Sequence, residues 1–148
     1  GPHYPRYYFA DQVVKITGKD DFVSKVSSAK YSERAAFISA DAFPTAPGAV
    51  RGVRESANRA TIDVESFGRG YLIMSVTPHK YWNVTLDGKR VEPLITNLGY
   101  QGIVVPAGRH RVEMRYSNTL VIRGAAISGV TTLLLLGIAC IRPRRRER

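Results

Sequence analysis

The alternation of apolar and polar positions is most regular in the middle of the chain. Residues 60–67 follow a period of two, with Ala60, Ile62, Val64 and Ser66 on one face, which predicts a β-strand with one buried face. Residues 71–76 are apolar almost throughout and predict a central strand that is covered on both faces. Two earlier stretches, 7–16 and 35–40, are rich in aromatic, β-branched or small apolar residues and are also expected to be strands.

A short amphipathic helix is expected between the two early strands. It begins near Lys19, where two acids occupy the first turn and favour the positive end of the helix dipole. The apolar residues that follow share helical spacing: Phe22, Val23 and Val26. The proline-rich stretch 43–48 is expected to be a loop.

The stretch YWNVTLDGKRVEP, residues 81–93, predicts a β-hairpin. Asp87-Gly88 suits a two-residue type I′ turn, in which both central residues have positive φ. In that register Leu86 opposes Lys89 and Val84 opposes Val91. Trp82, Val84 and Leu86 then share the face that is expected to cover the core.

A second hairpin is expected to turn at Pro106-Ala107-Gly108, between residues 102–105 and 109–116. In its last strand the apolar side chains point one way and the charged ones point into water. The two sets are Val112, Met114 and Tyr116 against Arg111, Glu113 and Arg115.

Many short strands separated by turns indicate a mainly β fold. We therefore predict an antiparallel β-sandwich, jelly-roll-like, with one short N-terminal helix and a C-terminal transmembrane α-helix. The expected boundaries are residues 1–118 for an extracytoplasmic β-sandwich, 119–141 for the transmembrane helix and 142–148 for a basic cytoplasmic tail.

The C-terminal segment carries the prediction of a membrane span. Residues 124–141 hold no formal charge, and as a helix they would extend about 27 Å, close to the hydrocarbon thickness of a bilayer. The alternative is a buried helix of a soluble core, but an arginine-rich flank follows at once and favours the span, with the flank in the cytoplasm. The residues expected at the membrane interface are Arg123, Arg142, Arg144, Arg145, Arg146 and Arg148.

The formal net charge is +10, part of it concentrated in the last seven residues, where five arginines face one glutamate. We see no lysine or arginine stripe interleaved with stacking aromatics and no helix-turn-helix pattern, so nucleic acid is not an expected partner. Cys140 is the only cysteine, so the chain forms no internal disulfide. It falls in the expected span, a poor place for a nucleophile.

No catalytic motif is evident. His3, His79 and His110 are scattered without metal-ligand spacing, and we expect neither a metal nor another cofactor. His110 is interpreted as a half-buried residue at a strand entrance. Asp63 and Glu65 share one strand face, where solvated surface is a simpler interpretation than an acid–base pair. No catalytic residue is assigned, and the chain by itself is not expected to be an enzyme.

Three aromatic residues are the candidates for ligand binding. Tyr81, Trp82 and Tyr100 could form a platform on which sugar rings stack, although packing against the sheet is the more ordinary role for such residues.

Several segments occur together in a characteristic order: PRYYF at residues 5–9, the region 22–40, the apolar strand 70–76, YWNVTLDGK at residues 81–89, GIVVPAGRHRVEMRY at residues 102–116, and the apolar C-terminal segment. This order resembles the C-terminal extracytoplasmic domain and following helix of the YfhO family of bacterial polytopic membrane proteins, related to the C-type glycosyltransferase superfamily. The family has a glycine before the tryptophan, whereas this chain has Lys80-Tyr81-Trp82.

The resemblance implies an accessory domain and membrane anchor of a larger protein that transfers lipid-linked sugars to cell-envelope polymers. Its partners would be the lipid bilayer, the other transmembrane helices of that protein, and an envelope glycan or lipid-linked sugar. The superfamily's catalytic acid is expected in an early loop that this chain lacks, so no catalytic role is carried over. The alternative is a single-pass, membrane-anchored carbohydrate-binding or adhesion module.

Overall fold

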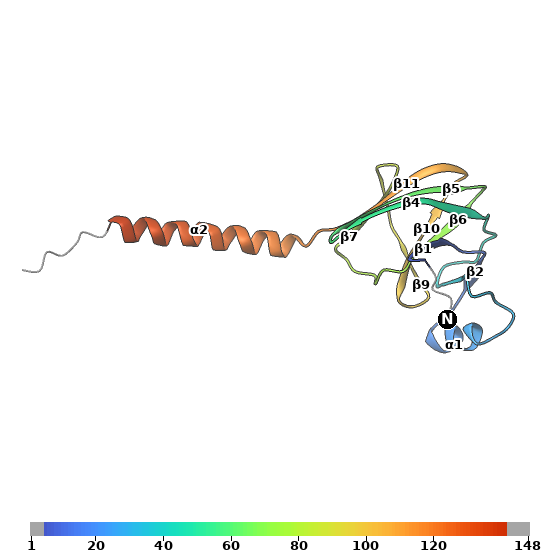
Figure 1. Cartoon of the computed structure of the whole chain (residues 1–148). Helices are drawn as coiled ribbons and strands as arrows, with labels where there is room; N and C mark the ends of the chain where they lie inside the picture. Colours follow the sequence, from blue (N-terminus) through green and yellow to red (C-terminus); the bar gives the residue numbers. More distant parts are fainter. Residues whose placement is uncertain (1–4, 142–148) are drawn as a thin grey trace, which may run out of the picture. The chain divides into compact units, whose positions relative to one another are not determined.

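The computed structural model describes residues 5–141, except for the side chains at positions 119, 122, 123, 126 and 139–141. The chain forms two compact units, residues 1–116 and residues 117–148, and each is described by itself. The first unit, the β-domain, contains every strand and the short helix that the structure describes (Figure 1).

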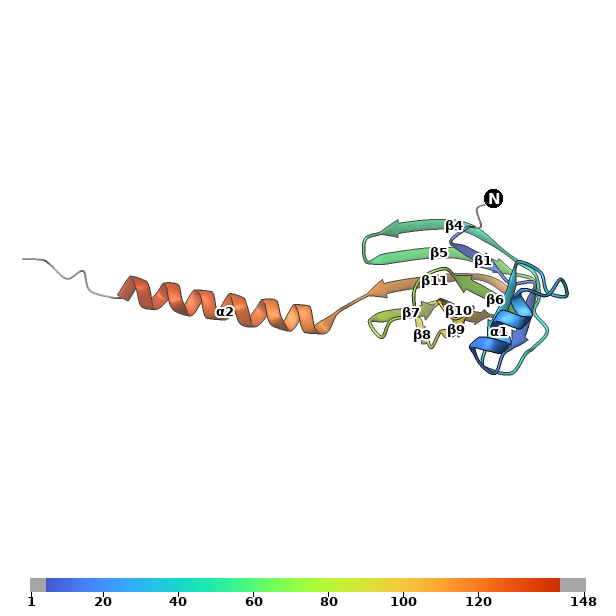
Figure 2. The same ribbon diagram turned by 90° about the horizontal axis from the view of Figure 1, so that it is seen from below.

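The β-domain is built of two sheets, seen from two directions in Figures 1 and 2. Sheet A has the strand order β1-β6-β10-β9-β3-β2, and sheet B has the order β4-β5-β11-β7-β8. The elements are β1 Tyr7–Phe9, β2 Gln12–Lys15, α1 Lys19–Val26, β3 Ala35–Ile38, β4 Gly48–Ser56, β5 Arg59–Ser66, β6 Gly70–Met74, β7 Trp82–Leu86, β8 Lys89–Val91, β9 Leu94–Thr96, β10 Tyr100–Val105 and β11 Gly108–Tyr116.

The two sheets pack face to face around one large core. Sheet A contributes Leu72 and Met74, and sheet B contributes Ile62, Val64 and Met114, all essentially inaccessible to solvent. The predicted alternation of β5 is confirmed, because its inward residues are buried and its outward residues are only partly covered. The mainly β fold with two sheets is therefore confirmed, whereas the jelly-roll-like topology stays a prediction.

Sheet A curls back on itself and encloses a second core. Its two edge strands, β1 and β2, are joined by Ala10-Asp11 alone, a connection that spans at most about 11 Å. Six strands laid flat would hold the edges about 24 Å apart, so the sheet must curve until its edges approach. The enclosed side chains include Tyr8, Tyr71 and Ile73.

This curvature corrects the single strand expected over residues 7–16. The stretch forms two strands, because the chain leaves β6 after Phe9 and joins β3 from Gln12 onwards. The β2–β3 pair is parallel, in a domain whose other pairs among the described strands are antiparallel. The continuous apolar run 71–76 is explained as well, since successive residues of β6 fill the two different cores.

The first predicted hairpin is confirmed, including both predicted residue pairs. Leu86 lies opposite Lys89, and Val84 lies opposite Val91. Asp87 and Gly88 have φ values of 50° and 78°, the positive angles that a type I′ turn requires. Trp82, Val84 and Leu86 all contact the core between the sheets.

The second predicted hairpin is wrong. β10 pairs with β6 and β9 in sheet A, whereas β11 pairs with β5 and β7 in sheet B. The segment 106–107 is thus a crossing from one sheet to the other, with Gly108 at a φ of 118°. The predicted alternation of β11 holds, because Val112 and Met114 are buried and Arg111 is exposed.

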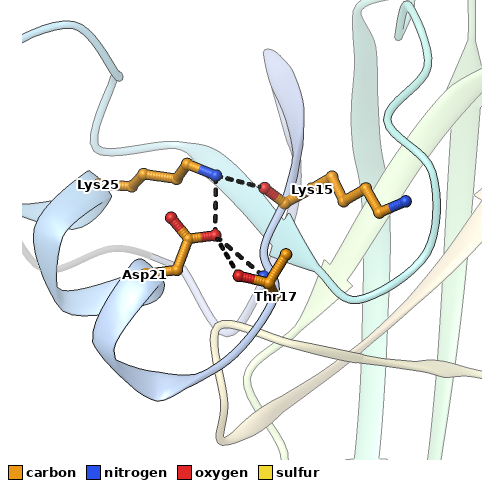
Figure 3. A network of polar contacts seen from close by, with 4 residues as sticks. All are labelled: Lys15, Thr17, Asp21 and Lys25. Carbon is orange, nitrogen blue, oxygen red and sulfur yellow. Dashed lines mark hydrogen bonds and ion pairs between the residues drawn. The ribbon is translucent and has the colours of Figure 1, made fainter.

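The predicted short helix is confirmed as α1, and a polar network fixes its first turn (Figure 3). Asp21 Oδ2 accepts hydrogen bonds from the Thr17 backbone N–H at 2.9 Å and from Lys25 Nζ at 2.9 Å. Lys25 Nζ also donates to the Lys15 carbonyl oxygen at 2.8 Å, which ties the helix to the end of β2. The bond from Lys25 holds the pKa of Asp21 below its usual value.

The second unit contains helix α2, Thr119–Ile141, of 23 residues. Of the helices in the described part of the chain, none combines the length and the hydropathy that crossing a bilayer requires. The structure thus does not bear out the transmembrane character expected of residues 119–141, although it places a helix there.

Candidate functional site

A pocket of about 280 Å³ lies beside Trp82. Its lining combines the indole with charged and polar side chains from β8, β10 and the connections that precede β7 and follow β8: His79, Lys80, Arg90, Glu92 and Gln101. Gln101 is buried and donates a hydrogen bond to the Thr77 carbonyl oxygen at 3.4 Å. An aromatic wall with several polar groups can accommodate a sugar-sized polar ligand.

Trp82 also belongs to a cluster of rings that includes His79, Tyr81 and Tyr116. The Trp82 and Tyr116 rings meet edge to face with their centroids 5.3 Å apart, and the Tyr81 and Tyr116 rings do so at 5.9 Å. These contacts explain why Trp82 and Tyr81 are half-buried, since each ring covers part of another. Trp82 thus contacts this ring cluster and also lines the pocket.

The third predicted stacking residue, Tyr100, lies elsewhere. It is 39% exposed at the start of β10, and it lines none of the described surface around Trp82. Because side chains alternate along a strand, β10 directs Gln101 into the pocket and Tyr100 to the opposite side. Tyr81, Trp82 and Tyr100 thus do not form one platform.

The six arginines expected at a membrane interface cannot be placed. Arg142, Arg144, Arg145, Arg146 and Arg148 lie outside the described residues, as does the side chain of Arg123. The side chain of Cys140 is likewise not described, and His3 lies outside the described residues.

The Asp63 and Glu65 carboxylates lie on the outer face of sheet B, each between two arginines from neighbouring strands. Arg111 Nε donates to Asp63 Oδ1 at 2.8 Å, and this bond is the main reason that the pKa of Asp63 is lowered. Arg51 Nε donates to Glu65 Oε2 at 2.9 Å and lowers the pKa of Glu65 in the same way. Both carboxylates are therefore ionised partners of arginines, and their lowered pKa makes them poor acceptors of a proton.

His110, near the start of β11, is hydrogen-bonded to the Asp87 turn. Its Nδ1 lies 2.6 Å from Asp87 Oδ2, and its Nε2 lies 3.2 Å from the Ala107 carbonyl oxygen. Both partners accept hydrogen bonds, so only the imidazolium, which donates from both nitrogens, satisfies them together. The bond to Asp87 raises the pKa of His110. The expected half-buried position of His110 is confirmed.

The largest of the described pockets, about 500 Å³, lies along the edges of β1 and β4. Tyr7 Oη donates to Glu55 there, and Arg6 pairs with the same carboxylate at 3.2 Å. Burial raises the pKa of the Tyr7 hydroxyl, which keeps it protonated and able to donate. Sequence reasoning missed this pocket because it did not recognise β4 as a strand.

Within residues 5–141, no group of three or more histidine, cysteine, aspartate or glutamate side chains is arranged to hold a metal ion.

Comparison with known proteins adds no relative. No protein-family model, no curated protein sequence and no solved structure matches the chain.

Proposed function

We propose that the chain is a non-catalytic, extracytoplasmic accessory domain whose helix α2 anchors it in a lipid bilayer. The larger protein would be polytopic and similar to the YfhO family, and would transfer lipid-linked sugars to a cell-envelope polymer. In this proposal the β-domain lies outside the cytoplasm and the arginine-rich C-terminus lies in it.

The exposure of the apolar side chains of α2 is the observation that carries the anchoring proposal. The large apolar residues of α2 whose side chains are described are all 58–71% exposed: Leu120, Val121, Ile127, Val130, Leu133, Leu134, Leu135, Leu136 and Ile138. Four consecutive leucines cover every side of a helix, because successive residues are about 100° apart. A contiguous apolar surface of this kind calls for lipid or for other helices around it.

The polar side chains of α2 are consistent with an apolar environment. Thr131 Oγ1 donates to the Ile127 carbonyl oxygen, and Thr132 Oγ1 donates to that of Ser128, both at 2.9 Å. These hydroxyls need no water as acceptor, which lowers the cost of placing them in lipid. At 1.5 Å per residue, the 23 residues extend about 34 Å, comparable to the apolar thickness of a bilayer.

Reconstitution of the full chain into lipid vesicles tests the anchoring. We expect the chain to stay with the vesicles after extraction with alkaline carbonate, and a fragment containing α2 to be protected from added protease. The variant lacking residues 142–148 should insert with less uniform orientation, because it has lost the basic flank. Release of the wild-type chain by carbonate, or complete digestion of α2, would contradict the proposal.

The pocket beside Trp82 favours a second candidate function, a single-pass carbohydrate-binding module that needs no other helices. Glycan-array binding by the full chain in detergent, abolished in W82A, would support this candidate. The Y100A variant is the matched control, since Tyr100 does not line the pocket.

A further inference from the structure

The outer face of sheet B carries a two-dimensional array of arginines, here called the basic face. In the strand register, Ile62 and Val112 point into the core, so the residues next to them point outward. The outward charged positions of β4, β5 and β11, together with the residue of the β4 bulge, are six arginines and three acids: Arg51, Arg54, Arg59, Arg109, Arg111, Arg115, Asp63, Glu65 and Glu113. Six of the ten arginines of the β-domain thus lie on one face.

The ion pairs of this face present the arginines to solvent. The side chains of Glu65 and Asp63 are only 20% and 32% exposed, whereas those of Arg51, Arg54, Arg109 and Arg111 are 57–83% exposed. Arg109 and Arg111 use Nε for these pairs, which leaves their terminal nitrogens for another acceptor. The acids therefore lie beneath the guanidinium groups and hold them in place.

Arg59 and Arg115 form the least compensated part of the basic face. They lie directly opposite each other on neighbouring strands, and among the described residues neither has an ion pair with an acid. Like charges in directly opposed positions destabilise a sheet. An external anion would remove this cost.

The layout of the arginines indicates which anion fits. Along β11, Arg109 and Arg115 are six residues apart, about 20 Å, and the array spans three strands, about 10 Å. The outward positions of sheet B include no aromatic or large apolar side chain within the described strands. Stacking on bases or sugars and insertion between lipid tails are thus disfavoured, while contact with many phosphates in one plane is favoured.

We propose that the basic face lies against anionic phospholipid headgroups and holds the β-domain on the bilayer surface. The proposal rests on the proposed function in one respect, because anchoring by α2 keeps the β-domain close to the headgroups. Arginine recognises their phosphates through paired N–H donors, and each basic residue near an anionic surface strengthens the contact.

The test measures the distance of the basic face from the headgroups. The full chain is labelled with a fluorophore at T61C, in the middle of the face, or at S24C on the exposed side of α1, both in a C140S background. Nanodiscs contain a headgroup-nitroxide quencher and either phosphatidylcholine alone or phosphatidylcholine with phosphatidylglycerol. We expect stronger quenching at residue 61 in the anionic nanodiscs, reversed by high salt, and no composition dependence at residue 24.

The double variant R59Q/R115Q separates binding from stability. It removes only the opposed pair, so we expect unchanged or slightly higher thermal stability together with an about thirtyfold weaker headgroup contact. The control variant K19Q/K30Q also removes two positive charges, but outside the basic face. Its label at residue 61 should be quenched as strongly as that of the wild type. Equal quenching in neutral and anionic nanodiscs, or equal losses in the two double variants, would overturn the proposal.

Two further arms assign failure to its cause. Soluble polyphosphate is the first alternative ligand. If it binds through Arg59 and Arg115 while quenching at residue 61 stays at the level of the neutral nanodiscs, the partner of the basic face is a soluble polyanion and not the lipid surface. If the chain enters neither kind of nanodisc, the anchoring function fails by itself. Co-sedimentation of the chain with anionic vesicles then tests headgroup binding without insertion. Equal co-sedimentation of the wild type and R59Q/R115Q overturns the proposed headgroup contact.

Discussion

The β-domain and helix α2 differ in the solvent exposure of their large apolar residues. In the β-domain, Leu72, Tyr71 and Val105 are completely inaccessible to solvent. In α2, a leucine such as Leu133 is 71% exposed, and its neighbours are similar. The comparison indicates that the β-domain carries its own core, whereas the described apolar side chains of α2 form no core within their own unit.

The largest effect should come from breaking the apolar surface of α2. Replacing Leu133 and Leu135 by lysine is expected to cost membrane insertion about 5–7 kcal/mol, since each central lysine costs about 2.5–3.5 kcal/mol. Carbonate extraction of reconstituted vesicles measures the loss, and L133A/L135A is the control that keeps the surface apolar. Full retention of the lysine variant would contradict lipid as the partner of α2.

The second prediction concerns the removal of a buried apolar side chain from the core of the β-domain. L72A empties a position between the two sheets and should lower the free energy of unfolding by about 2–5 kcal/mol. L134A, the same substitution in α2, should change it by less than about 0.5 kcal/mol. Urea denaturation followed by Trp82 fluorescence compares the two, and similar losses in both variants would mean that α2 shares the core of the β-domain.

A smaller effect is expected at the polar contact inside sheet A. The Tyr71 hydroxyl meets Thr96 Oγ1 at 2.8 Å, and both groups are buried. T96V keeps the shape and leaves that hydroxyl without Thr96, so a loss of about 1–3 kcal/mol in unfolding free energy is expected. The double variant Y71F/T96V should recover part of this loss. No recovery would show that the hydrogen bond is not the cause.

The smallest effect concerns pH. The pKa of His110 is raised by Asp87, so the stabilisation is complete below the ordinary histidine pKa of about 6.5 and is lost as pH rises through the raised value. The pKa of Asp87 is lowered, chiefly by the Arg111 backbone N–H, so its own contribution is lost only in acid. D87N suits the positive φ of the turn and should therefore flatten the stability curve between pH 6 and 8.

Thermal melts across that pH range measure the effect, with D41N as the control because Asp41 pairs with Lys15 instead of a histidine. Parallel curves for D87N and the wild type would exclude His110 as the titrating group.

Local patterns in the sequence predicted several of the strands, β5 among them, and the first turn. The β5 alternation depends on neighbouring residues, and Asp87-Gly88 supplies its own turn geometry. The pairing of β10 and β11 could not be predicted in this way, because Pro106-Ala107-Gly108 suits a hairpin equally well as a crossing between sheets. Only the long-range partners of the two strands, β6 and β5, decide between them.

The candidate site was predicted only in part, because a sequence shows local patterns but not long-range neighbours. Trp82 was found because aromatic residues stand out in a sequence, but Tyr100 was grouped with it although strand alternation directs it elsewhere. The basic face was missed because β4, with its two glycines and two outward arginines, has a weak strand signal. Its arginines join those of β11 only across β5.

The curling of sheet A sets the order in which the chain can fold. Tyr8 pairs with Ile73, 65 residues later in the chain, and β1 has no other partner strand in its sheet, so β1 cannot join sheet A before β6 is available. Contacts of such long sequence separation slow folding. The β1 edge of sheet A is therefore expected to form slowly, because its only strand partner lies far away along the chain.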